Sequence, residues 1–224
     1  MASTHVADTR DELRRAAMFS DGPTPTMADL RALVDEATPF ATTVYETMAK
    51  LRDAMRGRLE EHYEPTDGVG TTSYAPFVDP DNKKPLAPTL EQAVVNLEDA
   101  LARLERATVQ VVNAAMEAVS DTNLEDENYK NSYGVPVIEG KIAAMGWTIQ
   151  RIKEEILPPL QQDWSGIKAD AQTHEEIREY RQKLRPLGVR VRSVLEDVDT
   201  MVFHLNPTLA RALNRRLGGD PDNM

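Results

Sequence analysis

The sequence predicts an all-α protein, namely an elongated antiparallel bundle of four long helices with short helices at both ends. Two observations predict this fold. Apolar residues recur in alternating steps of three and four along four stretches, and polar or proline-rich segments separate those stretches. A repeat that averages about 3.5 residues keeps one apolar stripe on one side of a helix, as in coiled coils and helical bundles. Strands would need alternation by two, and no convincing run of it occurs.

The first two stretches predict a helical hairpin over residues 27–120. Thr26 with Asp29 predicts the start of its first helix, because a hydroxyl at the N-cap and a polar side chain three residues later satisfy the first free N–H groups. Thr89 with Gln92 predicts the start of the second helix in the same way. The first stripe is Leu30, Val34, Ala37, Ala41, Val44, Met48, Leu51 and Met55. The second is Leu90, Val94, Leu97, Leu101, Leu104, Thr108, Val111 and Ala115.

Prolines predict interruptions in this hairpin. Thr38–Pro39 predicts a kink or a fresh helix start in the first helix, because proline removes one backbone N–H donor. Residues 64–89 predict a long loop that no helix crosses, and a loop of this length is usually functional, ordered against a partner, or mobile. Tyr74 and Phe77 are the expected anchors of this loop on the bundle. Its prolines are Pro65, Pro76, Pro80, Pro85 and Pro88.

Residues 121–134 form an acidic linker, and residues 135–206 predict a second hairpin. Pro158–Pro159 predicts an end or a sharp bend in the third helix, and Pro186 predicts a bend in the fourth. The third stripe is Val135, Ile138, Ile142, Met145, Ile149, Ile152 and Ile156. The fourth is Ile177, Leu184, Leu187, Val191, Val194, Val198, Met201 and Leu205.

The two ends of the chain predict small additions to the hairpins. Residues 1–26 predict a short helix and a linker. Residues 207–224 predict a short basic helix and a tail. Arg211, Arg215 and Arg216 form a small basic patch there, which is either a solvated helix end or a contact for an acidic partner or lipid.

Trp164–Ser165–Gly166 lies between the third and fourth helices. A helix, a Trp-x-Gly turn and a second long helix over about residues 137–205 resemble the WXG family of small type VII secretion substrates. The resemblance implies that Trp164 packs at the hairpin end and that Gly166 permits the tight turn.

Composition and motifs argue against several classes of function. The chain has 224 residues, with 37 acidic against 26 basic side chains and a formal net charge of -11, which argues against nucleic acid as the main ligand. It has no cysteine, and hence no thiol nucleophile and no Cys-based zinc site. His174 lacks the second histidine of a zinc-protease helix, because Arg178 occupies that position, and Ile142 replaces the hydroxyl of a phosphate loop. We therefore expect no enzyme, no cofactor and no metal site.

These features predict a non-enzymatic interaction or assembly protein, for example a subunit of a secretion system or virion. Its partner would be another protein or a second copy of the chain, with no nucleic acid. The alternative is a secreted effector or helical pore-forming protein, although no apolar run has membrane length and stable insertion is not expected. The absence of a leader predicts a cytoplasmic protein or export without a cleavable signal peptide. Secondary apolar positions widen the apolar face of the second helix and are expected to bind the partner: Val95, Val109, Val112 and Met116.

Overall fold

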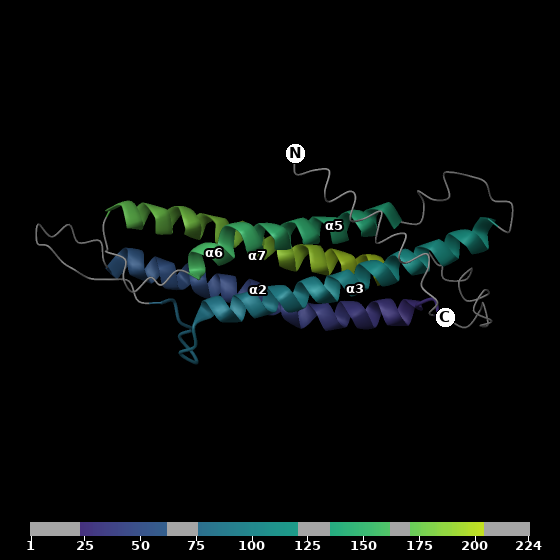
Figure 1. The fold of residues 1–224 in the computed structure, drawn as a ribbon, viewed down its shortest axis with the longest axis horizontal. Helices are drawn as coiled ribbons and strands as arrows, with labels where there is room; N and C mark the ends of the chain where they lie inside the picture. Colours follow the sequence, from purple (N-terminus) through teal and green to yellow (C-terminus); the bar gives the residue numbers. More distant parts are fainter. Residues whose placement is uncertain (1–22, 62–75, 121–134, 162–170, 204–224) are drawn as a thin grey trace, which may run out of the picture. The chain divides into compact units, whose positions relative to one another are not determined.

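The computed structural model describes residues 23–61, 76–120, 135–161 and 171–203, and this part of the chain is all-α (Figure 1). The described residues form no strand, and Val78 and Pro85 make an isolated antiparallel bridge. The long helices are α2 (Met27–Glu61), α3 (Leu86–Ser120), α5 (Val135–Arg151) and α7 (Ala171–Phe203). A π-helix, η1 (Ile152–Ile156), and a short helix, α6 (Leu157–Leu160), follow α5 directly. The expected terminal helices, in residues 1–26 and 207–224, lie outside the described residues apart from residues 23–26.

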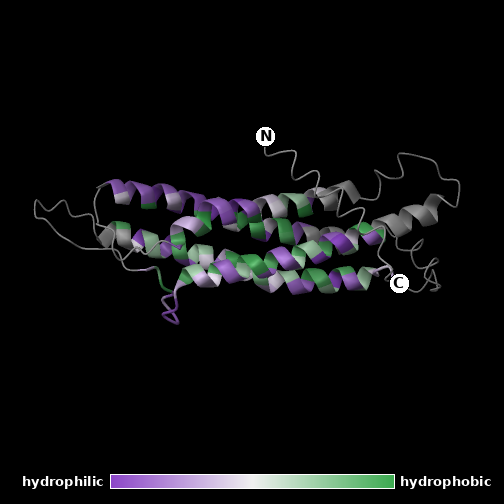
Figure 2. Ribbon diagram, viewed as in Figure 1, coloured by the Kyte–Doolittle hydropathy of each residue, from purple (hydrophilic) through white to green (hydrophobic). Residues whose placement is uncertain are grey.

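The apolar stripes predicted from the sequence are buried at every position whose side chain is described. All eight stripe residues of α2 are at most 2% exposed. In α3, the stripe is buried from Leu90 to Val111, and in α7 from Ile177 to Val194. Figure 2 shows the result as hydrophobic and hydrophilic residues alternating around the same helices. A spacing of three and four residues therefore identifies the buried side of each helix.

The chain divides into two units. Unit 1 comprises residues 1–37, 99–143 and 196–224, and unit 2 comprises residues 38–98 and 144–195. In unit 1, α2 and α3 are joined by a bidentate ion pair, in which Arg103 donates to both carboxylate oxygens of Glu36 at 2.5 and 2.9 Å. Lys141 and Asp197 form an ion pair between α5 and α7.

In unit 2, hydrogen bonds and an ion pair connect four helical segments, namely α2, α3, η1 and α7. Arg181 of α7 donates through Nε to the Arg52 carbonyl of α2 at 3.1 Å. The Tyr180 hydroxyl of α7 donates to the Ile156 carbonyl of η1 at 2.6 Å. Lys153 of η1 pairs with Glu98 of α3 at 2.9 Å. These bonds connect α2 to α7, α7 to η1 and η1 to α3.

Pro39 does not start a new helix, contrary to one of the two outcomes expected from the sequence. α2 runs through it from Met27 to Glu61. The Thr42 and Thr43 hydroxyls donate to the carbonyls of Thr38 and Pro39, at 2.9 and 2.8 Å. Proline removes one helical hydrogen bond, but the apolar stripe is buried on both sides of it, and burial of the stripe favours a continuous helix.

The helical path also continues through Pro158 and Pro159 rather than ending before them. These prolines lie in the first turn of α6, where a missing N–H costs little. The π-helix η1 precedes them, and the Leu157 N–H bonds to the Ile152 carbonyl five residues earlier. The wider π turn therefore places the prolines at the start of a new helical segment, which ends at Leu160.

α3 begins at Leu86, four residues before Leu90, the first helical residue that a cap at Thr89 predicts. The Leu86 N–H donates to the Phe77 carbonyl at 3.0 Å, and both side chains are buried. Thr89 lies inside the helix, where its hydroxyl donates to the Pro85 carbonyl at 3.3 Å instead of capping. Pro88 falls in the first turn, which tolerates proline. The predicted loop 64–89 therefore ends at residue 85.

The prediction at Thr26 is confirmed, because Thr26 N–H donates to Asp29 at 2.7 Å and Asp29 N–H to the Thr26 hydroxyl at 3.2 Å.

Candidate functional site

Six of the eleven residues that the sequence singled out lie outside the described residues: Tyr74, Trp164, Gly166, Arg211, Arg215 and Arg216. Val112 and Met116 lie within α3, but their side chains are not among those described. Phe77 is buried, Val95 is 43% exposed and Val109 is buried. Val95 and Val109 therefore do not share one exposed apolar face.

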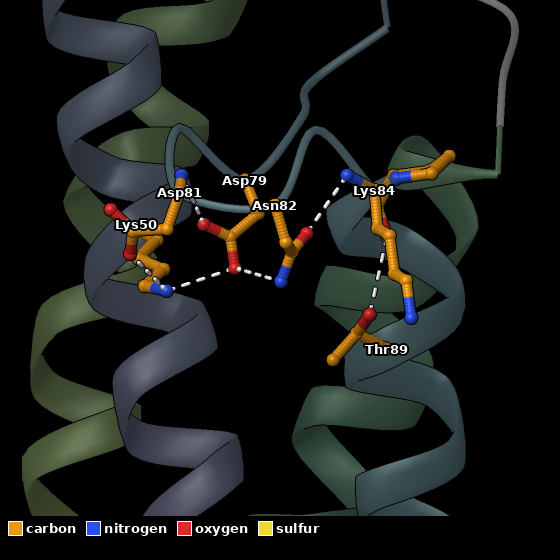
Figure 3. Close-up of polar contacts among 7 residues, drawn as sticks. Lys50, Asp79, Asp81, Asn82, Lys84 and Thr89 are labelled. Atoms are coloured by element: carbon orange, nitrogen blue, oxygen red, sulfur yellow. Dashed lines mark hydrogen bonds and ion pairs between the residues drawn. The ribbon is translucent and has the colours of Figure 1, made fainter.

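Asp79 organises a polar turn between Phe77 and Leu86, which we call the Asp79 turn (Figure 3). The Asp79 carboxylate accepts hydrogen bonds from the Lys50 ammonium at 2.8 Å, from the Asp81 N–H at 2.9 Å and from the Asn82 amide at 3.1 Å. Lys50 also pairs with Asp81 at 3.0 Å. The bond from Lys50 holds the pKa of Asp79 below its ordinary value, and the bond to Asp79 raises the pKa of Lys50. The ammonium already occupies the position between the carboxylates, so this cluster fastens the turn to α2.

The middle of α7 carries an unusual concentration of positive charge. Between residues 178 and 192, six of the seven charged residues are basic, in a chain whose net charge is -11. Residues 178, 181, 185 and 192 recur at helical spacing and form one stripe beside the buried face. Residues 183 and 190 form a second stripe on the other side. The basic residues are Arg178, Arg181, Lys183, Arg185, Arg190 and Arg192.

The first stripe borders an open groove of about 550 Å³ between α2 and α7 of unit 2. α2 contributes Arg52 and Arg56, which lie one helical turn apart. The bond from Arg181 to the Arg52 carbonyl holds the two helices together at this point. Asp53 is the acidic residue of the lining and lies 3.4 Å from the Arg52 guanidinium. The complete lining is Arg52, Asp53, Arg56, Arg181, Gln182, Arg185 and Pro186.

The second stripe borders a groove of about 490 Å³ on the other side of Pro186. Here α5 contributes Arg151, which binds Glu155 through two hydrogen bonds of 2.6 and 3.0 Å. This pair lowers the pKa of Glu155 and raises that of Arg151. The lining is Arg151, Glu179, Gln182, Lys183, Pro186, Leu187 and Arg190.

Trp147 stands at the edge of this second groove and is 49% exposed. The guanidinium carbons of Arg151 and Arg190 lie 5.0 and 4.7 Å from the centre of its ring. Arginines at this distance are attracted to the indole and are held in place by it. The ring therefore positions one arginine from α5 and one from α7 beside the groove.

The two grooves together form what we call the basic surface, lined by seven cationic and two anionic side chains. Guanidinium groups bind carboxylates and phosphates through paired N–H donors. Pro186 lies in both grooves and lacks the N–H that would otherwise bond to the Gln182 carbonyl. This arrangement can hold an extended or helical ligand that carries several negative charges.

Reading the sequence for its apolar stripes missed this surface. The signal was present, because the density and spacing of basic residues between 178 and 192 are visible without a structure. The contributions of Arg52, Arg56 and Arg151 were not visible, since they depend on which helices lie beside α7.

Among the described residues, no three or more His, Asp or Glu side chains are grouped so that they could hold a metal ion. No helix in the searched part of the chain combines the length and apolar character needed to cross a membrane. In comparisons with known proteins, no family model matches the chain, and no curated protein or solved structure shows significant similarity to it.

Proposed function

We propose that the chain is a non-enzymatic interaction or assembly protein, and that the basic surface binds an acidic region of a protein partner. Within this proposal, the helical segments of unit 2 form an antiparallel four-helix bundle. The hydrogen bonds and ion pairs between α2, α7, η1 and α3 support that arrangement. The assembly in which such a subunit would act is a secretion system, a virion or another large complex.

The observation that carries the proposal is the excess of seven cationic over two anionic side chains at the basic surface. Arginines placed side by side repel one another, and a negatively charged ligand lowers that repulsion. Four of them, at residues 52, 56, 181 and 185, line one groove. A ligand with several carboxylates would relieve that repulsion and gain charge-assisted hydrogen bonds.

A protein partner fits better than a nucleic acid. The phosphate backbone has a higher density of negative charge than a peptide and is repelled more strongly by a chain of net charge -11. The surroundings also contain half-exposed apolar and aromatic groups, including Trp147 and Val189. Aromatic residues and arginines are the side chains enriched at the centres of protein interfaces.

Several of the buried polar groups that are described have structural partners, which supports a non-catalytic role for them. The Thr108 and Thr148 hydroxyls donate to carbonyls four residues earlier in their own helices, both at 2.8 Å. Tyr180 donates to η1, and burial raises the pKa of its hydroxyl, so it stays protonated. Asp79 is bound by Lys50. The resemblance of residues 137–205 to the WXG family remains a prediction, because Trp164 and Gly166 lie outside the described residues.

The experiment that tests the proposal measures binding of a fluorescein-labelled polyglutamate peptide by fluorescence anisotropy. We expect binding to weaken with added salt, and Arg185→Glu to raise the half-saturating concentration by about tenfold, because it both removes a cation and adds an anion. Arg106→Glu is the matched control, since Arg106 is exposed on α3, lines neither groove and undergoes the same change in charge. Equal effects of the two substitutions would contradict the proposal. So would tighter binding of duplex DNA or anionic vesicles than of polyglutamate.

A further inference from the structure

Two exposed valines lie at the centre of oppositely charged patterns with the same spacing. On α3, Val95 is flanked by Glu91 four residues before and Glu98 three residues after. On α7, Val189 is flanked by arginines at the same two offsets, Arg185 and Arg192. Residues at these offsets lie on the same side of a helix as the central residue. We call the first set the acidic face and the second set the basic face.

Both valines are on the outer side of their helices. In a helix, a residue two positions away lies about 200° around the axis, which is nearly opposite. Ala93 and Leu97, on either side of Val95, are 5% and 0% exposed. Leu187 and Val191, on either side of Val189, are 3% and 0% exposed. Val95 and Val189 themselves are 43% and 48% exposed, so both point away from the core of unit 2.

We propose that the acidic face of one copy of this chain binds the basic face of a second copy, so that the protein assembles with itself. This inference rests on the proposed function, because Arg185 of the basic face also lines the basic surface. The two charged positions on each face are seven residues apart, about 10 Å along a helix, so both carboxylates can meet both guanidinium groups. The valines then pack together between the two ion pairs, and water is removed from their exposed surfaces.

The two faces cannot meet within one chain, because both belong to unit 2 and each lies opposite the buried side of its helix. Their pairing therefore requires two copies. Because the two faces are different, the contact is heterologous and leaves one free acidic face and one free basic face on every dimer. Such contacts produce a ring if the rotation closes and an open chain if it does not.

The charged side chains of both faces retain solvent-exposed surface. Glu98 pairs with Lys153, but its side chain remains 44% exposed. Glu91 accepts a hydrogen bond of 3.2 Å from Gln161 and is exposed. Arg192 lies 5.5 Å from the centre of the Tyr45 ring, which holds its guanidinium at the surface. Carboxylates and guanidinium groups have several lone pairs and donors, so a second partner can be added at each.

The net charge of -11 opposes association, but mainly over long distances. At physiological ionic strength the Debye length is about 8 Å, so charges farther apart than this are largely screened, whereas ion pairs in contact are screened less. One helix face is at the small end of interface sizes, and we expect association between about 10 µM and 1 mM.

The test exchanges the charges of the two faces. The first variant, Arg185→Glu with Arg192→Glu, carries two acidic faces, and the second, Glu91→Lys with Glu98→Lys, carries two basic faces. Sedimentation velocity of the full chain over that concentration range should find the wild type associating and each variant alone shifted at least about tenfold toward the monomer. An equimolar mixture of the two variants should associate again, because every acidic face then has a basic partner. Circular dichroism of each variant verifies that the helices are retained.

A wild type that stays monomeric throughout, or a mixture that does not regain association, would overturn the inference. In either case, polyglutamate binding that still depends on Arg185 would leave the proposed function standing, so the two failures are distinguishable. Val95→Arg should also weaken association, whereas Val78→Arg should not, since Val78 is 41% exposed but belongs to neither face. Equal effects of these two substitutions would likewise count against the inference.

Discussion

α2 and α3 begin with the same sequence signature, and only α2 uses it. Each has a threonine followed three residues later by a polar side chain that can complete a capping box. At Thr26 and Asp29 the reciprocal hydrogen bonds form and α2 starts there. At Thr89 they do not, because the chain is already helical from Leu86.

The difference lies in what precedes each helix. Before α3, the Phe77 and Leu86 side chains are buried, and the backbone between them is closed by hydrogen bonds from Asp79 N–H to the Lys84 carbonyl at 2.8 Å and from Lys83 N–H to the Asp79 carbonyl at 2.9 Å. Lys83 adopts a φ of 59°, which is uncommon for a side-chain-bearing residue and is held by this turn. Burial of two large side chains is worth more than one cap, so tertiary contacts move the start of α3.

Removing the Phe77 side chain should produce the largest effect. Phe77→Ala is expected to lower the free energy of unfolding by about 3–5 kcal/mol, because it deletes a buried aromatic ring and leaves a cavity. Urea denaturation measures this loss. Val78→Ala is the matched control, since this neighbouring side chain is exposed, and it should change stability by less than about 0.5 kcal/mol. Equal losses in the free energy of unfolding from Phe77→Ala and Val78→Ala would contradict the explanation that burial of Phe77 sets the start of α3.

The burial pattern and the α3 start differ in how far the sequence determines them. The apolar stripes follow from spacing alone, because a position on a helix fixes which side it is on. The start of α3 and the path through Pro158 depend on contacts with residues distant in the sequence, such as Phe77 with Leu86 and Tyr180 with Ile156. Local propensity cannot rank these contacts, so it placed the start of α3 incorrectly and did not predict the π-helix before Pro158.

The basic surface also has one part that the sequence could predict and one part that it could not. The basic stripes of α7 could have been predicted from the spacing of residues 178–192. Their pairing with Arg52 and Arg56 into one groove could not, because nothing in the sequence says that this part of α2 lies beside α7. Val95 and Val109 were both expected from the sequence to bind a partner, and only the structure separates the exposed Val95 from the buried Val109.

Neutralising Asp79 should have the next largest effect, and the effect should depend on pH. The bond from Lys50 lowers the pKa of Asp79 in the folded state, so ionised Asp79 favours folding. This stabilisation is complete above the unfolded-state pKa of about 3.9 and is lost as the pH falls through the lower folded-state value. Asp79→Asn should therefore lower the urea midpoint at pH 7 and approach the wild type in strong acid.

Asp81→Asn is the control for Asp79→Asn, since Asp81 is far more exposed and its substitution should have a smaller effect. A difference between Asp79→Asn and the wild type that does not change with pH would contradict the role of the Lys50 pair.

Removing the cap of α2 should produce a smaller loss. Thr26→Ala deletes the hydroxyl that accepts from the Asp29 N–H, and such caps contribute about 1 kcal/mol. The bond from the Thr26 backbone N–H, which is the larger cause of the lowered pKa of Asp29, would remain, whereas the hydroxyl bond that also lowers it would be lost. Urea denaturation again measures the free energy of unfolding. If removing a threonine that does not cap its helix lowered stability by the same amount, the assignment of Thr26 as the cap of α2 would be contradicted.

Thr89→Ala provides that comparison and should have the smallest effect, within about 0.5 kcal/mol of the wild type. Its hydroxyl bonds to the Pro85 carbonyl, which is exposed and can bind water instead, and alanine has the higher helix propensity. The sharper test combines it with Phe77→Ala. If burial of Phe77 and Leu86 displaces the start of α3, removing the Phe77 ring should let the helix begin at Thr89, and Thr89→Ala should then cost about 1 kcal/mol, as Thr26→Ala does. Additive effects of the two substitutions would mean that α3 starts at Leu86 for a reason other than this burial.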